Sequence, residues 1–552
     1  MVKNIFPIII VGVFGFIAGL SLLHKGLPPT HDGEYHVVRF YEFNKAFLDG
    51  NWYPRWAQDL NNGYGIPLFN FVYPFPNYVA VIFHSFGISF IDAFKYEMFM
   101  AIMLGGLFFY LWTKDFWGKL GAMVSSVFYT FSPYHFLDIY IRGSVGEVWA
   151  LAFFPAFLWS ITEFIKYHQR TFLVLSSISL SLIIFSHNIL ALMFLPFSVT
   201  YIYFLIYHSK DKKQLILNTF YVILLGFGLS AIFWLPALLE RQYVAGLQIF
   251  DVLAHFPEFY ELIVPSWGSG FSAGGLQNQL SFQIGIANLT AVFISLLIFL
   301  SGKKKDKNRL ILLFFLVWFV LIVFLMLKIS SSIWQYIPFM NYFQFPWRLL
   351  SLEILIASFL AGGVVYHWKK ILLVICLITF SFLLGIGYTN PAYYHYRNDN
   401  YYLARANFID GTNSPGNSFN TIWMKRSLGR EKEKIKFLKG EGEVNALSAI
   451  STHYKFNVVA RKPSEMVVNI AYFPGWTVFV DRQKKKIKYN SDGLINFLIP
   501  AGKHSIDVIL LDTDIRKLAS LVTIISALYS IVVLTNPLMG VLWRKWRSQN
   551  KY

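Results

Sequence analysis

Long apolar runs separated by short basic gaps dominate this sequence. A helix needs about 20 mostly apolar residues to cross a hydrocarbon core roughly 30 Å thick, and about twelve runs approach that length. They are residues 5–23, 96–112, 119–134, 147–165, 171–186, 189–207, 215–236, 285–300, 310–328, 347–367, 371–388 and 516–538. The pattern predicts a polytopic α-helical membrane protein with about twelve transmembrane helices.

The basic residues between these runs predict the topology. Short cytoplasmic loops are enriched in lysine and arginine. Such residues gather at 114–119, 166–170, 210–213, 303–309, 369–370 and 544–551. All six places lie on one side only if residues 78–90, about 13 residues, form a re-entrant or interfacial helix that does not cross. We therefore expect a multi-pass protein of the cytoplasmic membrane with both termini in the cytoplasm.

The first apolar run predicts a retained signal anchor. Lys3 precedes it, His24 and Lys25 follow it, and no small-residue cleavage pattern is present.

Four segments should then face outward, namely 24–77, 133–147, 237–283 and 390–514. The last contains short β-rich runs, MVVNIAYF, TVFVD, LINFLIP and IDVILL, separated by turn signals such as PGW and NSDG. They predict a C-terminal extracytoplasmic β-domain, either a sandwich or a meander, whereas residues 390–462 are less periodic and are assigned only as mixed or irregular. The expected organisation is a transmembrane domain over 1–388 with an outward first loop at 24–77, a mixed and β domain over 389–515, and a last helix with a basic tail over 516–552.

Composition agrees with a chain that lies mostly in lipid. Hydrophobic residues make up 56% of the chain, charged residues only 14%, and the mean hydropathy is +0.49. The net charge of +18 comes from the loop lysines and arginines, so we interpret it as a topology signal and not as a nucleic-acid surface. A single cysteine, Cys376, excludes a disulfide framework or a cysteine-based zinc site within one chain.

The first outward loop carries the densest set of reactive side chains. The string PPTHDGEYHVVRFYEF contains His31, Asp32, Glu34, His36 and Arg39. A carboxylate at the membrane surface can act as a general base on an incoming hydroxyl. Two imidazoles with carboxylates, His31 and His36 above all, could instead hold a divalent metal ion. No cofactor is certain. A third interpretation is that these residues are only the polar side chains of a solvated loop.

Two further places offer charged side chains at the predicted outer face. In SPYHFLDIYIRGSVGEVWA, Asp138 and Arg142 are either a local ion pair or a second acid with a phosphate contact. In NYFQFPWRLLSLEIL, Arg348 either snorkels to the lipid headgroups or binds a ligand. Glu240 and Arg241, after FWLPALL, form a similar but weaker pair.

These strings resemble a known family. HDGEYHVVRFYEF, NGYGIPLFNFVYPFP, YHFLDIYIRGSVGE, FWLPALLE, PSWG and QFPWR are similar to the membrane proteins described as 6-pyruvoyl-tetrahydropterin synthase-related, which are close to YfhO-type proteins. The C-terminal FPGWTVFVD and IPAGKHSIDV resemble the β-domain of YfhO-type chains. The soluble zinc chemistry of a pterin synthase is not expected, because its histidine pattern is absent from the sequence.

The resemblance implies the GT-C architecture of polytopic glycosyltransferases, which use polyprenyl-phosphate-linked sugars. It implies that Asp32 is the catalytic aspartate of the first loop, while Glu34 sits one residue further along than the adjacent acid of many relatives. Asp138 and Arg142 would occupy a second catalytic loop, and Arg348 would meet the donor phosphate. His31, His36, Arg39 and Trp267 would contact the substrates, with outward aromatics stacking on the sugar.

The leading hypothesis is therefore a membrane hexosyltransferase that moves a sugar from a polyprenyl-phosphate donor to an extracytoplasmic glycan, lipid or protein acceptor. Membrane lipid is an expected partner and nucleic acid is not. Two alternatives stay open, a non-catalytic sugar-binding accessory protein and a transporter of lipid-linked sugars. A transporter would be expected to carry charges along its spans, and the central parts of the predicted spans have few.

Overall fold

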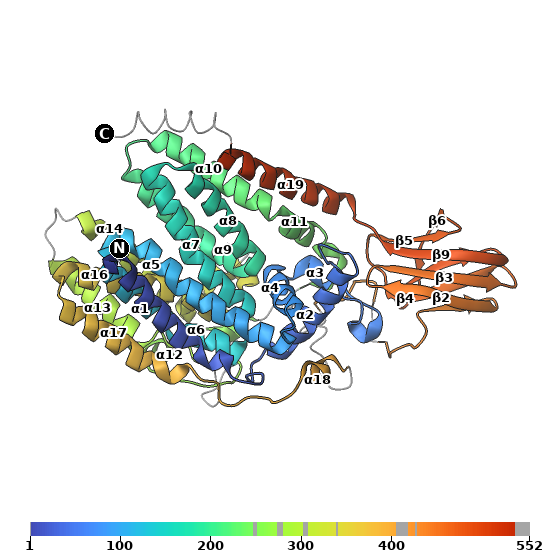
Figure 1. Cartoon of the computed structure of the whole chain (residues 1–552), viewed down its shortest axis with the longest axis horizontal. Helices are drawn as coiled ribbons and strands as arrows, with labels where there is room; N and C mark the ends of the chain where they lie inside the picture. Colours follow the sequence, from blue (N-terminus) through green and yellow to red (C-terminus); the bar gives the residue numbers. More distant parts are fainter. Residues whose placement is uncertain are drawn as a thin grey trace.

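A body of packed helices occupies one end of the molecule, and a domain of β-strands occupies the other (Figure 1). The computed structural model describes residues 2–246, 251–272, 280–301, 307–337, 340–404, 418–424 and 428–535. The long helices are α1 (Val2–Gly19), α2 (Gly33–Leu48), α4 (Phe75–Ser85), α5 (Phe90–Thr130), α7 (Val145–Tyr167), α8 (Arg170–Ser186), α9 (Asn188–Tyr207), α10 (Lys212–Leu229), α11 (Ala231–Leu239), α13 (Ile286–Ser301), α14 (Lys307–Met326), α16 (Leu350–Trp368), α17 (Ile371–Gly385) and α19 (Asp514–Thr535). Short helices are α3 (Leu68–Phe71), α6 (Pro133–Phe136), α12 (Phe259–Ile263), α15 (Ser331–Tyr336) and α18 (Asp399–Leu403).

The protein is a polytopic helical membrane protein. Within the described residues, eight helices are long and apolar enough to cross a membrane, or nine if α10 and α11, bent by 73°, form one broken span. The predicted number was about twelve. The difference arises where two predicted spans fall inside α5 and where α8 and α13 have only 17 and 16 residues. Helix α4 has only 11 residues and is not a candidate span among the described residues. That residues 78–90 form a re-entrant or interfacial helix stays a prediction.

Helix α5 is a hairpin of two antiparallel arms. Its backbone reverses at Gly118, with φ 67° and ψ −178°. The Ser126 hydroxyl donates to the Gly106 carbonyl at 2.7 Å, and the rings of Phe109 and Tyr129 stack at 4.3 Å. In one straight helix, residues 20 positions apart would be about 30 Å from each other. The two arms correspond to the predicted segments 96–112 and 119–134.

Gly118 should be sensitive to any side chain, because its backbone conformation is essentially restricted to glycine. Although a Cβ there would meet no atom within 4 Å, we expect Gly118→Ala to lower the free energy of unfolding by about 1–3 kcal/mol. Gly12→Ala is the control, since Gly12 lies in α1 with equally open space. Thermal unfolding of the purified variants measures the difference, and equal losses for both would contradict this role of Gly118.

Helices α7 and α16 form the centre of the helical body. Over an 18-residue stretch of their spans, 89% and 94% of the residues are buried, compared with 17% for α19. Each of the two central helices begins next to a charged turn, formed by Leu137–Arg142 before α7 and by Pro346–Leu349 before α16. The ends of the two most protected helices therefore place charged side chains in a region shielded from solvent and lipid.

The β-domain consists of two antiparallel sheets. One has the order β1-β4-β8-β7 and the other β2-β3-β9-β5-β6. The strands are β1 (Ile435–Lys439), β2 (Gly442–Ile450), β3 (His453–Ala460), β4 (Ser464–Ala471), β5 (Trp476–Val480), β6 (Gln483–Lys485), β7 (Lys488–Tyr489), β8 (Leu494–Ile499) and β9 (Gly502–Leu510). Inward side chains of both sheets, including Phe456, Val468 and Ile506, share one hydrophobic core. The description of residues 390–462 as mixed or irregular was wrong for β1–β3, whose register is regular apart from local bulges.

The first loop joins this core to the helical body. Trp56 and Tyr64 are buried with the β-domain residues, and Trp56 packs edge-on against Trp476 at 5.4 Å. The Ala471 amide donates to the Tyr64 carbonyl at 2.9 Å. Close by, buried Glu240 pairs with Arg516 at 2.9 Å, while Arg241 donates instead to the Tyr342 hydroxyl. The β-domain is thus held against α2, α11 and the start of α19.

Candidate functional site

The first and second predicted polar segments meet at the start of α2. The His31 amide donates to the Ile141 carbonyl and the Asp32 amide to the Arg142 carbonyl, both at 2.9 Å. Gly143, with φ 67°, lies directly against Thr30, and a side chain there would collide with the threonine hydroxyl. This close approach fixes Asp32 beside the π-helical turn Leu137–Arg142, a backbone form that is frequent at functional sites.

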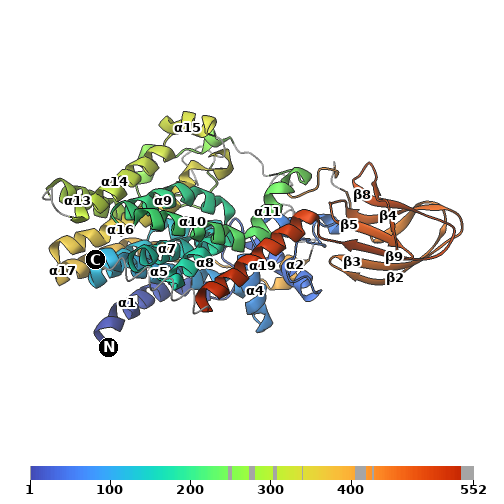
Figure 2. The same ribbon diagram turned by 90° about the horizontal axis from the view of Figure 1, so that it is seen from above.

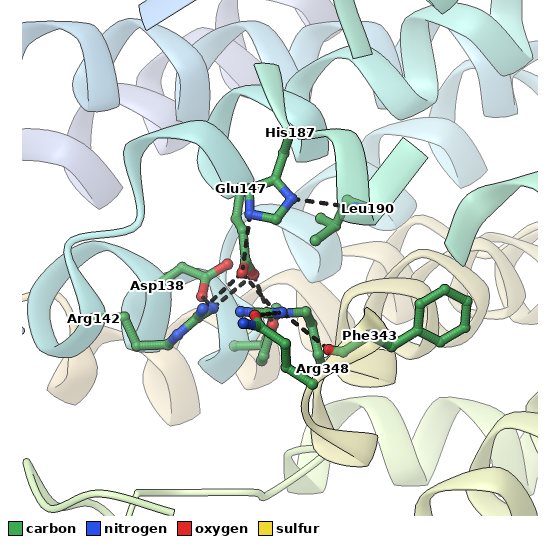
Figure 3. Close-up of polar contacts among 9 residues, drawn as sticks. Asp138, Arg142, Glu147, His187, Leu190, Phe343 and Arg348 are labelled. Atoms are coloured by element: carbon green, nitrogen blue, oxygen red, sulfur yellow. Dashed lines mark hydrogen bonds and ion pairs between the residues drawn. The ribbon is translucent and has the colours of Figure 1, made fainter. Parts of the chain in front are cut away.

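Glu147 is the centre of a buried ionic network (Figure 3). Its two carboxylate oxygens accept from Nη1 and Nη2 of Arg142, both at 2.6 Å. Arg348 Nε lies 2.9 Å from the same carboxylate, and the Tyr134 hydroxyl donates to it at 3.1 Å. Glu147 is 0% exposed, so the carboxylate is held in a dry, fully occupied position at the first turn of α7.

Asp138 completes the neutralisation of Arg142. Arg142 Nη1 contacts the Asp138 carboxylate as well as Glu147, and its guanidinium lies 5.0 Å from the centre of the Trp347 ring. Burial and the Glu147 charge raise the pKa of Asp138, while the charge of Arg142 and its hydrogen bond to Asp138 oppose this rise. The other Asp138 oxygen, Oδ2, is buried and has no hydrogen-bond partner among the described residues. Asp138 and Arg142 therefore form the local ion pair that was one of the two interpretations of the sequence. Asp138 Oδ2 stays available to a ligand or water.

Arg348 is anchored on three sides. Its Nη1 donates to the Phe343 carbonyl at 3.0 Å and to the Gln344 side chain at 2.9 Å, while Nε faces Glu147. No hydrogen bond from its Nη2 is found within the described ranges. Arg348 is 5% exposed, so it does not snorkel to the surface, and one edge of its guanidinium is the part that can reach an anion.

His187 closes the network from the junction of α8 and α9. Its Nδ1 accepts from the Leu190 amide at 3.2 Å, which places the ring proton on Nε2, 3.7 Å from Glu147. Burial lowers the pKa of His187 to about 3, so the ring is neutral.

Tyr73, near the end of the first loop, packs against this histidine. Its ring centre is 5.2 Å from that of His187, and it lies against Gly146. Burial raises the pKa of its hydroxyl, which also responds to the charges of Arg39 and Asp32. The charges of Asp32 and Glu147 both act on this hydroxyl, so Tyr73 is close to both parts of the site.

The Asp32 carboxylate is close enough to respond to the charges of Arg142 and Glu147, and it makes no hydrogen bond to any described residue. It lies at the N-terminus of α2 but does not cap the helix. Burial raises the pKa of Asp32, while the Arg142 and Arg39 charges oppose the shift. A partly buried carboxylate with nearby cations and an open hydrogen-bonding capacity is suited to take a proton from a substrate hydroxyl.

The two histidines of the first loop make separate contacts. The His31 ring hydrogen-bonds the Ser269 carbonyl at 2.9 Å and stacks on Phe271 at 4.8 Å. The His36 ring is buried and stacks on Phe94 at 5.8 Å. No group of three or more histidine, cysteine, aspartate or glutamate side chains that could hold a metal occurs in the part of the chain that the structure describes.

Three other predicted residues lie at the edge of the site or away from it. The Trp267 ring packs on Tyr388 at 4.7 Å, although its loop reaches His31 through Ser269. Glu34 faces α18, where its charge contributes to the raised pKa of Tyr402. The Arg39 guanidinium lies 5.9 Å from the centre of the Tyr35 ring.

Sequence reasoning missed the centre of the network. Glu147 lies within the string SPYHFLDIYIRGSVGEVWA but was not assigned a role, and His187, Tyr73 and Tyr134 were not considered. The position of Glu147 in the sequence could have identified it as a site residue. It falls in the first turn of an apolar run, where an ionisable group is costly unless it is paired. His187, between two apolar helices, carries the same signal.

The fold and the ionic network at its centre define a class, a polytopic helical membrane protein with a C-terminal β-sheet domain and a buried charged site. The family described as "6-pyruvoyl-tetrahydropterin synthase related domain; membrane protein" matches residues 69–390. The chain belongs to this family, and the family prediction is confirmed.

Comparison with individual proteins gives more distant likenesses. A Lactococcus lactis subsp. cremoris (strain MG1363) protein described as uncharacterized is 23% identical over 228 residues, 38% of this chain. The match spans only 37% of that protein's length.

Solved structures with a similar arrangement include three glycosyltransferases. Arabinofuranosyltransferase AftD from Mycobacteria shares 13% identity, with a TM-score of 0.42 over 70% of this chain and 27% of that one. ArnT from Cupriavidus metallidurans, bound to undecaprenyl phosphate, shares 14%, with a TM-score of 0.42 over 72% and 68%. The Archaeoglobus fulgidus oligosaccharyltransferase shares 14%, with a TM-score of 0.45 over 73% and 56%. These likenesses assign no residue.

Proposed function

We propose that this protein is a membrane glycosyltransferase that moves a sugar from a polyprenyl-phosphate donor to an extracytoplasmic acceptor. The observation that carries the proposal is the position of the Asp32 carboxylate, which has no hydrogen-bond partner in the described ranges and lies beside Arg142 of the buried network. A base and fixed cations side by side are what transfer from a phosphate leaving group requires. The resemblance of the first-loop string to GT-C enzymes supports the same assignment.

The proposed step needs only these groups. Asp32 takes the proton of the acceptor hydroxyl, and the acceptor oxygen forms a bond to the anomeric carbon of the donor sugar. The bond from that carbon to the phosphate oxygen breaks, and its electron pair leaves with the polyprenyl phosphate. The free edge of Arg348 stabilises the charge that develops on the phosphate, because a fixed cation in a water-poor site is worth far more than one in water.

Glu147 and Asp138 have a positioning role in this proposal. Glu147 fixes both guanidinium groups, and Asp138 balances Arg142. The predicted role of Asp138 as a second acid is replaced by that of a counter-ion, and Arg348 becomes the main phosphate contact. We further propose about twelve crossings, both termini in the cytoplasm, and the β-domain and the site on the outer face.

The experiment that tests the proposal is a donor panel. Purified protein in lipid nanodiscs is incubated with radiolabelled polyprenyl-phosphate sugars and candidate acceptors, and free polyprenyl phosphate is measured. Release of the lipid phosphate with at least one donor supports a transferase. Tight donor binding without any release would favour the accessory protein, and movement of intact donor between leaflets would favour the transporter.

Tyr73→Phe should reduce transfer without unfolding the protein. The ring keeps its packing against Gly146 and His187, and only the hydroxyl is lost. We expect this hydroxyl to donate to the substrate, and loss of one such donor at a reacting centre costs about 10²-fold in rate. The turnover rate and the unfolding temperature are measured together, with Tyr35→Phe, on the same loop, as the control. An unchanged rate in Tyr73→Phe would remove this hydroxyl from the site.

A further inference from the structure

A groove of about 710 Å³ lies where the β-domain joins the last helix. The residues that matter for its chemistry come from the end of β4, from β6 and the residue after it, and from the chain around the start of α19. They are Tyr472, Lys484, Lys485, Lys486, Asp512 and Lys517. The volume falls in the range of pockets that hold small ligands or headgroups, about 300–1,000 Å³. The groove is separate from the Glu147 network, and nothing in the proposed transfer uses it.

The β6 side of the groove carries unbalanced positive charge. Lys517 is paired with Asp514 at 3.2 Å, and Asp512 lies 3.6 Å from Arg55. The three consecutive lysines on the opposite wall, 484–486, form no ion pair within 4 Å with any carboxylate of the described residues. They are partly or fully exposed, so their ammonium groups can turn toward an anion in the groove.

The groove opens at the expected membrane boundary. The candidate span α19 starts at Asp514, in the wall of the groove. Leu511 and Leu518, on either side of this point, are 44% and 54% exposed. The view from above shows α19 leading from the β-domain onto the helical body (Figure 2). A lysine cluster at this end is not explained by the positive-inside rule, because the short basic loops were assigned to the other face.

We propose that this groove binds the phosphate headgroup of an anionic phospholipid and so holds the β-domain on the bilayer surface. The ammonium groups of Lys484–486 contact the phosphate, the acyl chains lie along the exposed leucines of α19, and Tyr472 lies at headgroup depth. Lysine suits this role as a compact point charge on a flexible stem. Each lysine near an anionic membrane surface contributes about fivefold to binding, so three together contribute about 100-fold.

Native mass spectrometry of the full chain in detergent tests this proposal. A short-chain phosphatidylglycerol is titrated against wild type and against the triple variant Lys484→Gln, Lys485→Gln, Lys486→Gln. Lys432→Gln, Lys439→Gln, Lys462→Gln is the control, because it removes the same charge from exposed positions of the same domain. The expected result is a tightly bound lipid in wild type and in the control, and binding weakened about 100-fold in the groove variant.

Three outcomes would overturn the proposal. The first is equal retention of phosphatidylglycerol and zwitterionic phosphatidylcholine by wild type. The second is an equal loss of lipid in the groove variant and in the control. The third is displacement of the lipid by an anionic oligosaccharide at lower concentration than by glycerol phosphate, which would assign the groove to a glycan. Unfolding temperatures of all three proteins separate loss of binding from loss of fold.

Discussion

Glu147→Gln should destabilise the protein by about 3–5 kcal/mol, since it leaves buried cations without their counter-charge. Glu147 accepts two hydrogen bonds from Arg142, pairs with Arg348 and is completely buried. Glutamine keeps the size of the side chain but removes the charge, and Asp138 alone then faces two guanidinium groups. Thermal unfolding followed by intrinsic tryptophan fluorescence measures the loss, and transfer activity should be lost with it.

Glu353→Gln is the matched control for this prediction. Glu353 is also fully buried at the start of α16, but neither of its carboxylate oxygens has a hydrogen-bond partner among the described residues. Removing a buried carboxylate that balances no cation should be neutral or stabilising. The central role of Glu147 would be contradicted if both variants unfolded at the wild-type temperature, or if both lost the same stability.

Asp32→Asn should lower the rate of donor consumption by about 10²–10⁴-fold, the usual contribution of a general base. The substitution keeps the backbone contact with Arg142 and removes no hydrogen bond of the carboxylate to a described residue, so the unfolding temperature should change little. Burial raises the pKa of Asp32, and only the ionised form accepts a proton. The wild-type rate should therefore be low at pH values below this raised pKa and should rise as the pH increases through it. The variant should lack this pH-dependent rise.

Glu34→Gln provides the comparison for Asp32. Glu34 is close in sequence but faces α18 and not the network. Its substitution should leave both the rate and the pH profile close to wild type. A variant at Glu34 that loses as much activity as Asp32→Asn would show that the first loop acts as a whole and that Asp32 has no distinct chemical role.

The sequence predicted those parts of the fold that depend on local pattern. Apolar runs long enough to cross lipid, the short α4 and the strands after residue 466 all follow from segment length, period and turn residues. The reversal of α5 at Gly118 was also visible in the sequence, because the predicted runs 96–112 and 119–134 are separated at this point. β1–β3 were missed although β3 alternates buried and exposed positions. The polar residues interspersed in these strands, such as Lys436, Glu443 and Lys455, hid this period in a search for apolar runs.

The sequence predicted most of the charged residues of the site but not which of them form ion pairs with one another. The charged residues of the first loop, the second loop and the QFPWR turn were each singled out, and the structure brings Asp32, Arg142 and Arg348 to one place. The carboxylate that links the two arginines could not be identified, because Glu147 and Arg348 are about 200 positions apart and their contact depends on how α7 and α16 pack. For the same reason the sequence could not show that the rings of His31 and His36, which were considered as possible metal ligands, pack on different neighbours, Phe271 and Phe94.

Transfer from a radiolabelled polyprenyl-phosphate sugar, measured side by side for wild type and Asp32→Asn, tests most directly whether the charged site is a glycosyltransferase centre. Both proteins are assayed in lipid nanodiscs at equal folded concentration, and released polyprenyl phosphate is counted against transferred sugar. We predict one equivalent of lipid phosphate released per sugar transferred by wild type, and almost none by Asp32→Asn. Equal release by the two proteins, or no release by folded wild type with any donor of the panel, would contradict the proposed function.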